Sequence, residues 1–334
     1  MQALQDILRD PLVLAGIPGL SLAALHHGEL ACVHAMGIRG SHDSAPVDAH
    51  TVFEAASLTK PVVSLIALQL VDEERLDLDA PLHTIGGDYV HGDARAQAIT
   101  ARHVLTHTSG LPNIVSDETP LKTYFPPGAR FNYGSSAFAW LQRAMEIRTG
   151  RALEDLACER VFTVFGMPDS SLRWEQRFET NHAQGHDLEG RPLAKRRPAC
   201  AAASWSLLTT ATDYARFVQA VLQGQGLSPA MHACWLTPAV QAREGVDEVL
   251  NADAALQEDV AWGLGWGIEP AQDCFFHWGN IPGFRSFVMA DRRTGDAVVW
   301  FANSDHGLRL AHRILPVTVP GHPRSLEWLQ VGPP

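Results

Sequence analysis

An apolar run that starts just after Ser57 and Lys60 is the feature that most constrains how this chain folds. Residues 62–71 are almost entirely aliphatic, which predicts a buried helix from Ser57 to about Glu73. A spacing of three places the Ser57 and Lys60 side chains on one face of that helix. Pro61 is tolerated only in a first turn, so we expect the helix to begin close to Ser57. The Ser57 hydroxyl then lies near the positive helix end, where a developing anion is favoured.

The Ser57 and Lys60 pair allows two interpretations. A serine hydroxyl needs a base to become a nucleophile, and a lysine whose pKa is lowered by burial can serve as that base. Alternatively, Ser57 merely caps the helix and Lys60 is a solvated residue of the first turn. An isolated S-x-x-K pattern recurs by chance, so the rest of the chain must decide between the two.

The composition describes a globular chain and argues against nucleic acid as a partner. The 334 residues are 46% hydrophobic and 19% charged, enough to bury a large core. The net charge is −11, and the only compact basic cluster is residues 194–198, so we expect no nucleic-acid binding. No apolar stretch approaches the ~18 residues needed to span a bilayer, so we expect no membrane partner.

The cysteines and the first ten residues bear on the compartment. The five cysteines are scattered and form no C-x-x-C pair, which is typical of buried thiols in a reducing compartment. Residues 1–10 predict a short amphipathic helix without the features of a signal peptide. We therefore expect a cytoplasmic protein, or a periplasmic one if a leader has been removed. The cysteines are Cys32, Cys158, Cys200, Cys234 and Cys274.

Strand patterns at both ends of the chain enclose a region of helical patterns. The expected strands are 20–25, 30–36, 263–268, 274–278, 286–290 and 297–302. The expected helices after residue 73 are 100–105, 137–147, 152–161 and 210–222. This order predicts an α/β (α+β) fold with one mainly antiparallel sheet built from both termini and flanked by helices. Residues 1–75 and 206–334 would form this sheet domain, residues 76–205 a mainly helical domain, and the active site would lie between them.

Three later segments can complete a Ser–Lys site. Residues 131–136 offer Tyr133, whose phenol can move a proton beside Lys60. Residues 277–285 form an expected strand followed by a turn, and a strand edge there can offer a backbone N–H for an oxyanion together with that of Ser57. The third segment, residues 105–112, is a loop whose path is fixed by a glycine and a proline.

In this order, the segments resemble the serine β-lactamase and penicillin-binding-protein-like superfamily. The likeness is to its class C β-lactamases, D-amino-acid-specific peptidases and β-lactamase-fold carboxylesterases, and it implies the β-lactamase/DD-peptidase-like fold. It extends from about residue 15 to residue 305. The motifs that carry it are residues 53–61, 78–81, 105–111, 127–128, 165–168, 263–267, 277–279 and 282–284.

The resemblance implies a role for each matching residue. Ser57 would be the acylated nucleophile, Lys60 its proton acceptor, and Tyr133 a helper in proton transfer and deacylation. His277, Trp278 and Gly279 match the third motif of the family, often K-T-G, on the strand that borders the site. The backbone N–H groups of Ser57 and Asn280 would form the oxyanion hole. The implied cycle acylates Ser57, releases an alcohol or amine, and ends with attack of water on the acyl-enzyme.

Two departures from the β-lactamase pattern shift the expected substrate from β-lactams to esters. Ser135 stands where β-lactamases usually carry the asparagine of Y-x-N, whose amide can contact the acyl side of the substrate. His277 replaces the lysine of K-T-G, and a histidine is mostly neutral near pH 7. Arg285 can compensate only if it points inward. Both changes resemble the esterase and peptidase branches more than efficient β-lactamases.

Other residues have plainer interpretations. His103 and His107 are four apart, but H-x-x-x-H without an inner glutamate is a poor zinc signal, so we expect no metal site and a structural, hydrogen-bonding His107. Asp213 is expected to cap a helix. Three tryptophans near the third motif either line an acyl pocket or fill the core, namely Trp262, Trp266 and Trp278.

The sequence therefore predicts a cofactor-independent serine hydrolase that cleaves small-molecule esters through an acyl-enzyme on Ser57. The alternatives within enzymes, which act on amides or β-lactams, are a D-aminopeptidase, a DD-carboxypeptidase or a weak β-lactamase. A non-enzymatic alternative is a binding protein on the same fold with an inactive site. The presence of Ser57, Lys60 and Tyr133 together argues against it.

Overall fold

The computed structural model describes residues 2–10, 15–41, 44–244, 249–250, 254–319 and 321–332. Within them, both ends of the chain meet in one eight-stranded sheet of order β2-β1-β10-β9-β8-β7-β6-β5, with every neighbouring pair antiparallel. The expected antiparallel sheet built from the two termini is confirmed. The strands are β1 (Gly19–His26), β2 (Glu29–Gly37), β5 (Val240–Arg243), β6 (Leu256–Trp262), β7 (Gly267–Glu269), β8 (Cys274–Ile281), β9 (Phe284–Asp291) and β10 (Ala297–Ala302).

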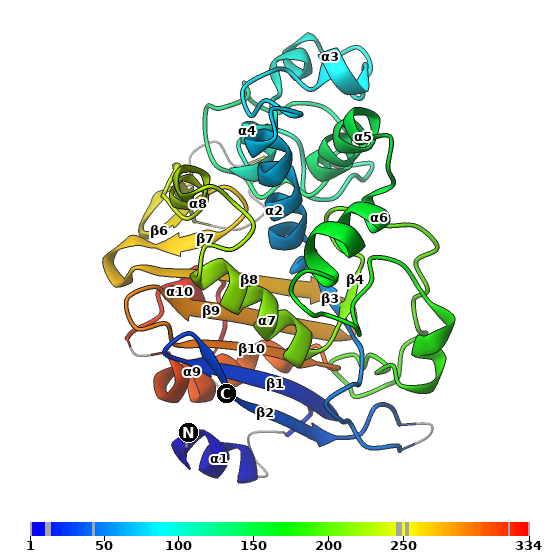
Figure 1. The fold of residues 1–334 in the computed structure, drawn as a ribbon, viewed down its shortest axis with the longest axis vertical. Helices are drawn as coiled ribbons and strands as arrows, with labels where there is room; N and C mark the ends of the chain where they lie inside the picture. The colour runs from blue at the N-terminus through cyan, green and yellow to red at the C-terminus, as the bar shows by residue number, and fades with distance from the viewer. Residues whose placement is uncertain are drawn as a thin grey trace.

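Helices cover both faces of this sheet (Figure 1). α7 (Ala211–Leu222) packs on one face, while α9 (Ala311–Thr318), with α1 (Gln2–Arg9) and α10 (Ser325–Trp328), packs on the other. Successive residues of a strand point to opposite faces. In β10, Val299 and Phe301 therefore join the core under α7, whereas Val298 and Trp300 join the core under α9. This double cover explains why the central strands are apolar throughout.

A mainly helical region follows α2 (Thr59–Asp72), which lies between the sheet and that region (Figure 1). All side chains of α2 from Thr59 to Leu70 are buried. Residues 76–205, all of them described, contribute no strand to the large sheet. The boundaries at residues 75 and 205 stay a prediction. The helices of this region are α3 (His83–Gly86), α4 (Ala101–Leu105), α5 (Ala137–Thr149) and α6 (Leu153–Ala157), with 3₁₀ turns at Ala94–Ala98 and Gln176–Thr180 and a π-helical turn at Cys158–Phe162.

Two short strands outside the large sheet flank the start of α2. β3 (Phe53–Ala56) ends directly before Ser57 and pairs with β4 (Leu207–Thr209). A separate short helix, α8 (Pro229–Trp235), lies against α2. The pairing of β3 with β4 joins the turn that carries Ser57 to the strand that leads into α7.

The predicted strand at 263–268 is wrong over most of its length. Residues 263–266 form the turn between β6 and β7, and only the last two residues of the predicted strand belong to β7. Gly265 has φ +101°, and a Cβ there would lie 2.0 Å from Ser64 Oγ on α2. Gly265 therefore serves a close approach of this turn to α2 rather than a strand.

Three helix ends also differ from the expectation. α2 begins at Thr59 rather than at Ser57, and the helix expected over 152–161 ends as α6 at Ala157 and continues as a wider turn. Asp213 does not cap α7: the Thr210 hydroxyl caps it by accepting a hydrogen bond from Asp213 N. The Asp213 carboxylate instead accepts from the 169–170 segment.

Two findings complete the description of the chain. The five cysteines are all free thiols. Among the described residues, no helix combines the length and apolar character needed to cross a bilayer.

Candidate active site

Ser57 and Lys60 meet at the turn between β3 and α2. Lys60 Nζ donates a hydrogen bond to Ser57 Oγ over 3.0 Å. Lys60 is fully buried, while Ser57 keeps partial exposure. The alternative of a capping serine beside a solvated lysine is wrong, because the residue before the helix is Leu58, without a side-chain cap, and Lys60 has no contact with solvent.

The backbone around Ser57 is held by hydrogen bonds from three directions. The Thr59 hydroxyl donates to Ala56 O over 2.7 Å and accepts from Leu207 N over 2.9 Å. The Tyr214 hydroxyl, from α7, donates to Leu58 O over 3.0 Å. Ala56 itself has φ +50°, a left-handed conformation that costs a non-glycine residue about 1–3 kcal/mol. These contacts offset that cost and fix the direction of the Ser57 side chain.

Aromatic rings and a carbonyl surround the Lys60 amine. Nζ donates a second hydrogen bond to Ser204 O over 2.9 Å, from the segment just before β4. The amine also lies 4.8 Å from the ring centre of Tyr133 and 5.4 Å from that of Phe138. The structure thus brings Ser57, Lys60 and Tyr133 together, as the chain order predicted.

His107 determines where the Tyr133 ring lies. The two rings are stacked, with centroids 4.2 Å apart and an interplanar angle of 29°. His107 Nδ1 accepts a hydrogen bond from Gly134 N over 3.0 Å, and His107 O accepts from Asn132 N over 2.8 Å. Because Nδ1 is the acceptor, a neutral His107 carries its proton on Nε2. The expected structural role of His107 in hydrogen bonding agrees with these contacts.

His107 is neutral at physiological pH. Burial is the main cause that holds its pKa well below the usual value of 6.5, and a positive charge on Lys60 acts in the same direction. His103, which the spacing pairs with His107, accepts from Thr100 N through Nδ1 in the capping box of α4. The two histidines therefore serve separate structural contacts.

The segment His277–Gly279 lies on β8, which packs against β3. A Cβ on Gly279 would lie 2.3 Å from Ala55 O and 2.1 Å from Ser286 Oγ, so only glycine allows this approach. Ser286 Oγ donates to Ala55 O over 3.0 Å and so ties β9 to β3 as well. The third motif therefore packs against β3 at Ala55, two residues before Ser57.

His277 is buried and neutral where the resemblance places a lysine. Burial, followed by the Lys60 charge, lowers the pKa of His277 from 6.5 to about 3. Its Nδ1 lies 2.9 Å from Trp278 N, while Nε2 has no hydrogen-bond partner among the described residues. The third motif therefore presents no cation at neutral pH.

Arg285 does not supply the missing cation. Its guanidinium forms an ion pair with Asp305 over 2.6 Å. It also donates to Ile281 O and Phe284 O, each over 2.9 Å. The charge is thus neutralised by Asp305 and held at the turn between β8 and β9.

The remaining expected site residues occupy different environments. Ser135 is half-buried just before α5, and Asn280 is exposed near the end of β8, opposite Arg285 in the β9 register. Trp278 is 6% exposed and its ring lies 4.9 Å from that of Tyr133. Trp262 and Trp266 are fully buried, so neither lines an open pocket.

The sequence reasoning missed Trp205. Trp205 is 38% exposed, although it directly follows Ser204, whose carbonyl accepts a hydrogen bond from Lys60. In the sequence, Trp205 is the single large residue among the small residues of 201–206, and this contrast could have pointed to it. An exposed tryptophan therefore follows directly on the residue whose carbonyl binds the buried Lys60 amine.

Comparisons with known proteins identify the family and the fold of the chain. The family model described as Beta-lactamase matches residues 4–317. Penicillin-binding protein 4 of Amycolatopsis lactamdurans is 25% identical over 80% of this chain and 74% of its own length. Protein flp of Staphylococcus aureus is 20% identical over 90% of this chain, which spans about 63% of flp. Esterase EstB of Burkholderia gladioli is 38% identical over 87 residues, which are 25% of this chain and 22% of EstB.

Solved structures show the same fold. The octameric penicillin-binding protein homologue from Pyrococcus abyssi superposes with a TM-score of 0.79, at 19% identity, over 95% of this chain and 76% of that one. A class C β-lactamase superposes with a TM-score of 0.78, at 18% identity, over 96% of this chain and 97% of that one. The expected fold class is confirmed.

Proposed function

The chain belongs to the beta-lactamase family of serine hydrolases, and on that premise we propose that it hydrolyses small carboxylic esters through an acyl-enzyme on Ser57. The observation that carries the proposal is the 3.0 Å hydrogen bond between Ser57 Oγ and the buried amine of Lys60. A nucleophile and its base within hydrogen-bond distance are the geometric requirement for covalent catalysis by serine.

In the acylation step, Ser57 Oγ attacks the ester carbonyl carbon while its proton passes to Lys60 Nζ. This step requires the neutral amine, which removal of Lys60 from water favours. The C–O bond to the alcohol then breaks, and the proton returns from Lys60 to the departing oxygen. The Tyr133 phenol, whose ring lies beside Lys60, would relay this proton. Attack of water on the acyl-enzyme repeats the sequence and frees Ser57.

The oxyanion of each tetrahedral intermediate needs N–H donors that are already in place. We assign these donors to the backbone of Ser57 and Asn280. The close packing of β8 on β3 at Gly279 supports the assignment, since it holds the next residue of β8 near the turn that carries Ser57. In this proposal, Gly279 serves the oxyanion hole because it has no side chain to keep β8 away from β3.

Three residues favour esters over β-lactams. A β-lactam carries a carboxylate, and His277 is neutral at physiological pH because burial lowers its pKa to about 3. The Arg285 charge is paired with Asp305. Ser135 has no amide to contact the acyl side of the substrate. The local similarity to esterase EstB supports the same choice.

Peptide cleavage is the second candidate. The similarity to penicillin-binding protein 4, which covers most of this chain, favours it. A D-aminopeptidase or DD-carboxypeptidase would use the same acylation on Ser57 and release an amine or amino acid instead of an alcohol. The leaving group, not the nucleophile, distinguishes the two candidates.

Steady-state assays test the substrate class. We would measure short p-nitrophenyl esters, nitrocefin and D-Ala-D-Ala peptides with the wild type, Ser57→Ala and the matched loop variant Ser116→Ala. Ser116 is exposed in the 113–120 loop and takes no part in the proposed site. The proposal expects ester hydrolysis by the wild type and Ser116→Ala, and none above background by Ser57→Ala. Faster turnover of the peptides or of nitrocefin than of every ester would contradict the assigned substrate class.

A further inference from the structure

Two hairpin turns far apart in the sequence lie side by side at one end of the sheet. They are the turn between β1 and β2 and the turn between β9 and β10. Gly28 N donates to Gly295 O over 2.8 Å, and a Cβ on Gly295 would lie 2.6 Å from Gly28 N. Gly295 has φ +74°, so glycine is required both for the turn and for the contact. The two turns are therefore fixed relative to one another.

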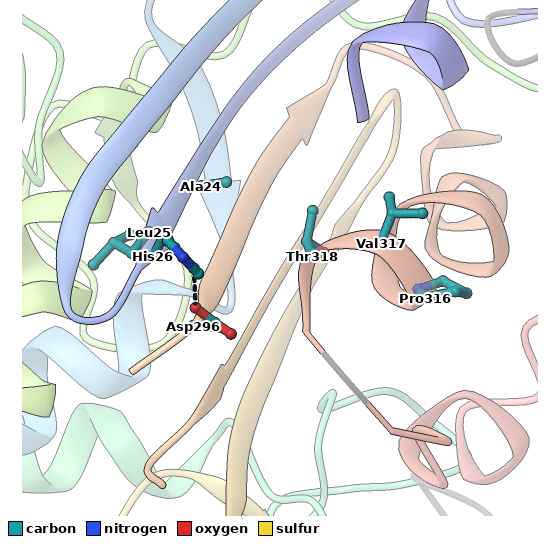
Figure 2. Close-up of a pocket in the computed structure, with 7 residues that line it drawn as sticks. All are labelled: Ala24, Leu25, His26, Asp296, Pro316, Val317 and Thr318. Carbon is teal, nitrogen blue, oxygen red and sulfur yellow. Dashed lines mark hydrogen bonds and ion pairs between the residues drawn. The ribbon is translucent and has the colours of Figure 1, made fainter. Parts of the chain in front are cut away.

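This contact gathers two imidazoles and a carboxylate. His26 Nδ1 lies 2.7 Å from Asp296 Oδ1, as Figure 2 shows. His27 N donates to the same oxygen over 3.2 Å, and the His26 and His27 rings are 3.9 Å apart between centroids. One potential ligand atom from each of the three side chains lies within 4.8 Å of the other two. In the described part of the chain, no other group of three such side chains comes this close.

Burial and space at this cluster suit a bound ion. The Asp296 side chain is only 13% exposed, so its position is fixed, whereas the His26 side chain is 57% exposed and can rotate. The pair borders an open pocket of about 260 Å³, which is lined on the other side by residues 316–318 at the end of α9 (Figure 2). This volume leaves room for a metal-bound water.

We propose that His26, His27 and Asp296 form a binding site for a divalent transition-metal ion, zinc in the first place, that links the two hairpin turns. Two imidazole nitrogens and one carboxylate oxygen are a donor set that zinc accepts, with water as the fourth ligand. The same set does not suit Mg²⁺ or Ca²⁺, which prefer oxygen ligands.

Only small side-chain movements are needed to form the site. Bonds of ~2.0–2.1 Å to a tetrahedral zinc ion separate the ligand atoms by about 3.3 Å. His26 Nδ1 and Asp296 Oδ1 would move apart from 2.7 Å as the ion replaces the proton that they share. The exposed His27 ring would turn from Thr294 O, which lies 3.2 Å from its Nδ1. His26 would bind as a neutral imidazole through Nδ1, with its single N–H proton on Nε2, so its charge does not change.

Calorimetric titration of chelator-treated protein with ZnCl₂ tests the site. We expect one zinc ion per chain for the wild type, and no corresponding heat with MgCl₂. His27→Asn and Asp296→Asn should each weaken zinc binding at least about tenfold. Asparagine is chosen for His27 because that residue has φ +51°, a conformation that asparagine tolerates. The control is His50→Ala, since His50 pairs with Asp169 over 2.8 Å without a second histidine.

Thermal unfolding gives an independent readout. An ion that binds only the folded state raises the melting temperature, so zinc should stabilise the wild type and His50→Ala but not His27→Asn. The proposal is overturned if the wild type takes up no zinc. It is also overturned if His27→Asn and Asp296→Asn bind zinc as the wild type does, or if His50→Ala loses as much affinity as they do.

Discussion

The imidazole of His107 lies stacked on the phenol of Tyr133, with ring centroids 4.2 Å apart. The same imidazole accepts a hydrogen bond from Gly134 N, so it holds both the ring and the backbone of the segment that carries Tyr133. His107 has φ +54° and is fully buried, and its own loop is held to Asn132 through the His107 carbonyl. His107 is therefore a positioning residue for Tyr133 in the proposed mechanism.

Replacing His107 should slow turnover more than it weakens substrate binding. His107→Leu removes the acceptor for Gly134 N and the stacked ring, so we expect kcat to fall about 10²-fold, with a much smaller change in KM. His107→Asn keeps an acceptor and tolerates the positive φ, and should recover part of the loss. Ester kinetics with urea unfolding as a check on folding provide the measurement. Equal kcat for His107→Leu and the wild type would show that His107 does not position Tyr133.

Gly279→Ala should displace one of the two proposed oxyanion donors, the Asn280 N–H, while leaving Ser57 and Lys60 in place. Its Cβ would lie 2.3 Å from Ala55 O, so β8 must move away from β3. Loss of one oxyanion donor costs about 10²–10³ in kcat, and we expect a fall in this range. Gly332→Ala is the matched control, because no atom lies within 4 Å of a Cβ there. If Gly279→Ala kept wild-type kcat, the assignment of Asn280 N–H to the oxyanion hole would be wrong.

Buried neutral histidines should make the protein less stable in mild acid. His277 has a pKa of about 3 when folded, against 6.5 when unfolded. Between these values the unfolded chain binds a proton that the folded chain does not, so the free energy of unfolding falls as the pH falls below 6.5. From pH 7 to pH 5, His277 alone should lower it by about 2 kcal/mol. His182, whose pKa burial also lowers to about 3, acts in the same direction.

Urea unfolding of the wild type and His277→Gln at pH 7 and pH 5 measures this contribution. The comparison cancels the effect of Asp213, whose burial raises its pKa to about 6 and which therefore opposes the histidines. His277→Gln should lose about 2 kcal/mol less than the wild type over this interval. The same loss in both proteins would mean that His277 is not a buried neutral group.

Trp205 is expected to contact the apolar part of the ester. Trp205 is 38% exposed next to the carbonyl that binds Lys60. Trp205→Ala should reduce the preference for p-nitrophenyl butyrate over the acetate by about tenfold in kcat/KM, since added methylenes would lose their contact surface. Leu188→Ala, which truncates another exposed apolar side chain, is the control. An unchanged butyrate-to-acetate ratio in Trp205→Ala would exclude this contact.

Local patterns predicted the parts of the fold that consist of long apolar segments. The strands β1, β2, β8, β9 and β10 and the helix α2 follow from continuous apolar runs between turns. The strands β3 to β6 were not predicted: β3 and β4 are short and pair across about 150 residues, whereas β5 and β6 are rich in polar residues and lack an apolar run. The alternation of glycine with apolar residues at 263–267 predicted a strand. Most of this segment is instead a turn, in which Gly265 allows a contact with Ser64 that only the tertiary structure reveals.

Only part of the candidate site could likewise be predicted from the sequence. Chain order identified Ser57, Lys60 and Tyr133, and the structure places them side by side. The carbonyl of Ser204 and the stacking of His107 could not be predicted, because nothing in a local pattern specifies which distant backbone group meets a side chain. The contact of Arg285 with Asp305 likewise required the structure to decide whether that cation was available.

The proposed mechanism depends on an acyl-enzyme at Ser57, and mass spectrometry of the labelled protein tests for a reactive Ser57. The wild type and Ser57→Ala would each be treated with a fluorophosphonate, and the labelled peptide identified after digestion. We expect one adduct in the wild type, on the peptide that contains Ser57, and none in Ser57→Ala. An adduct of equal yield in Ser57→Ala, or a wild type that hydrolyses esters but is labelled on another residue, would contradict the proposed mechanism.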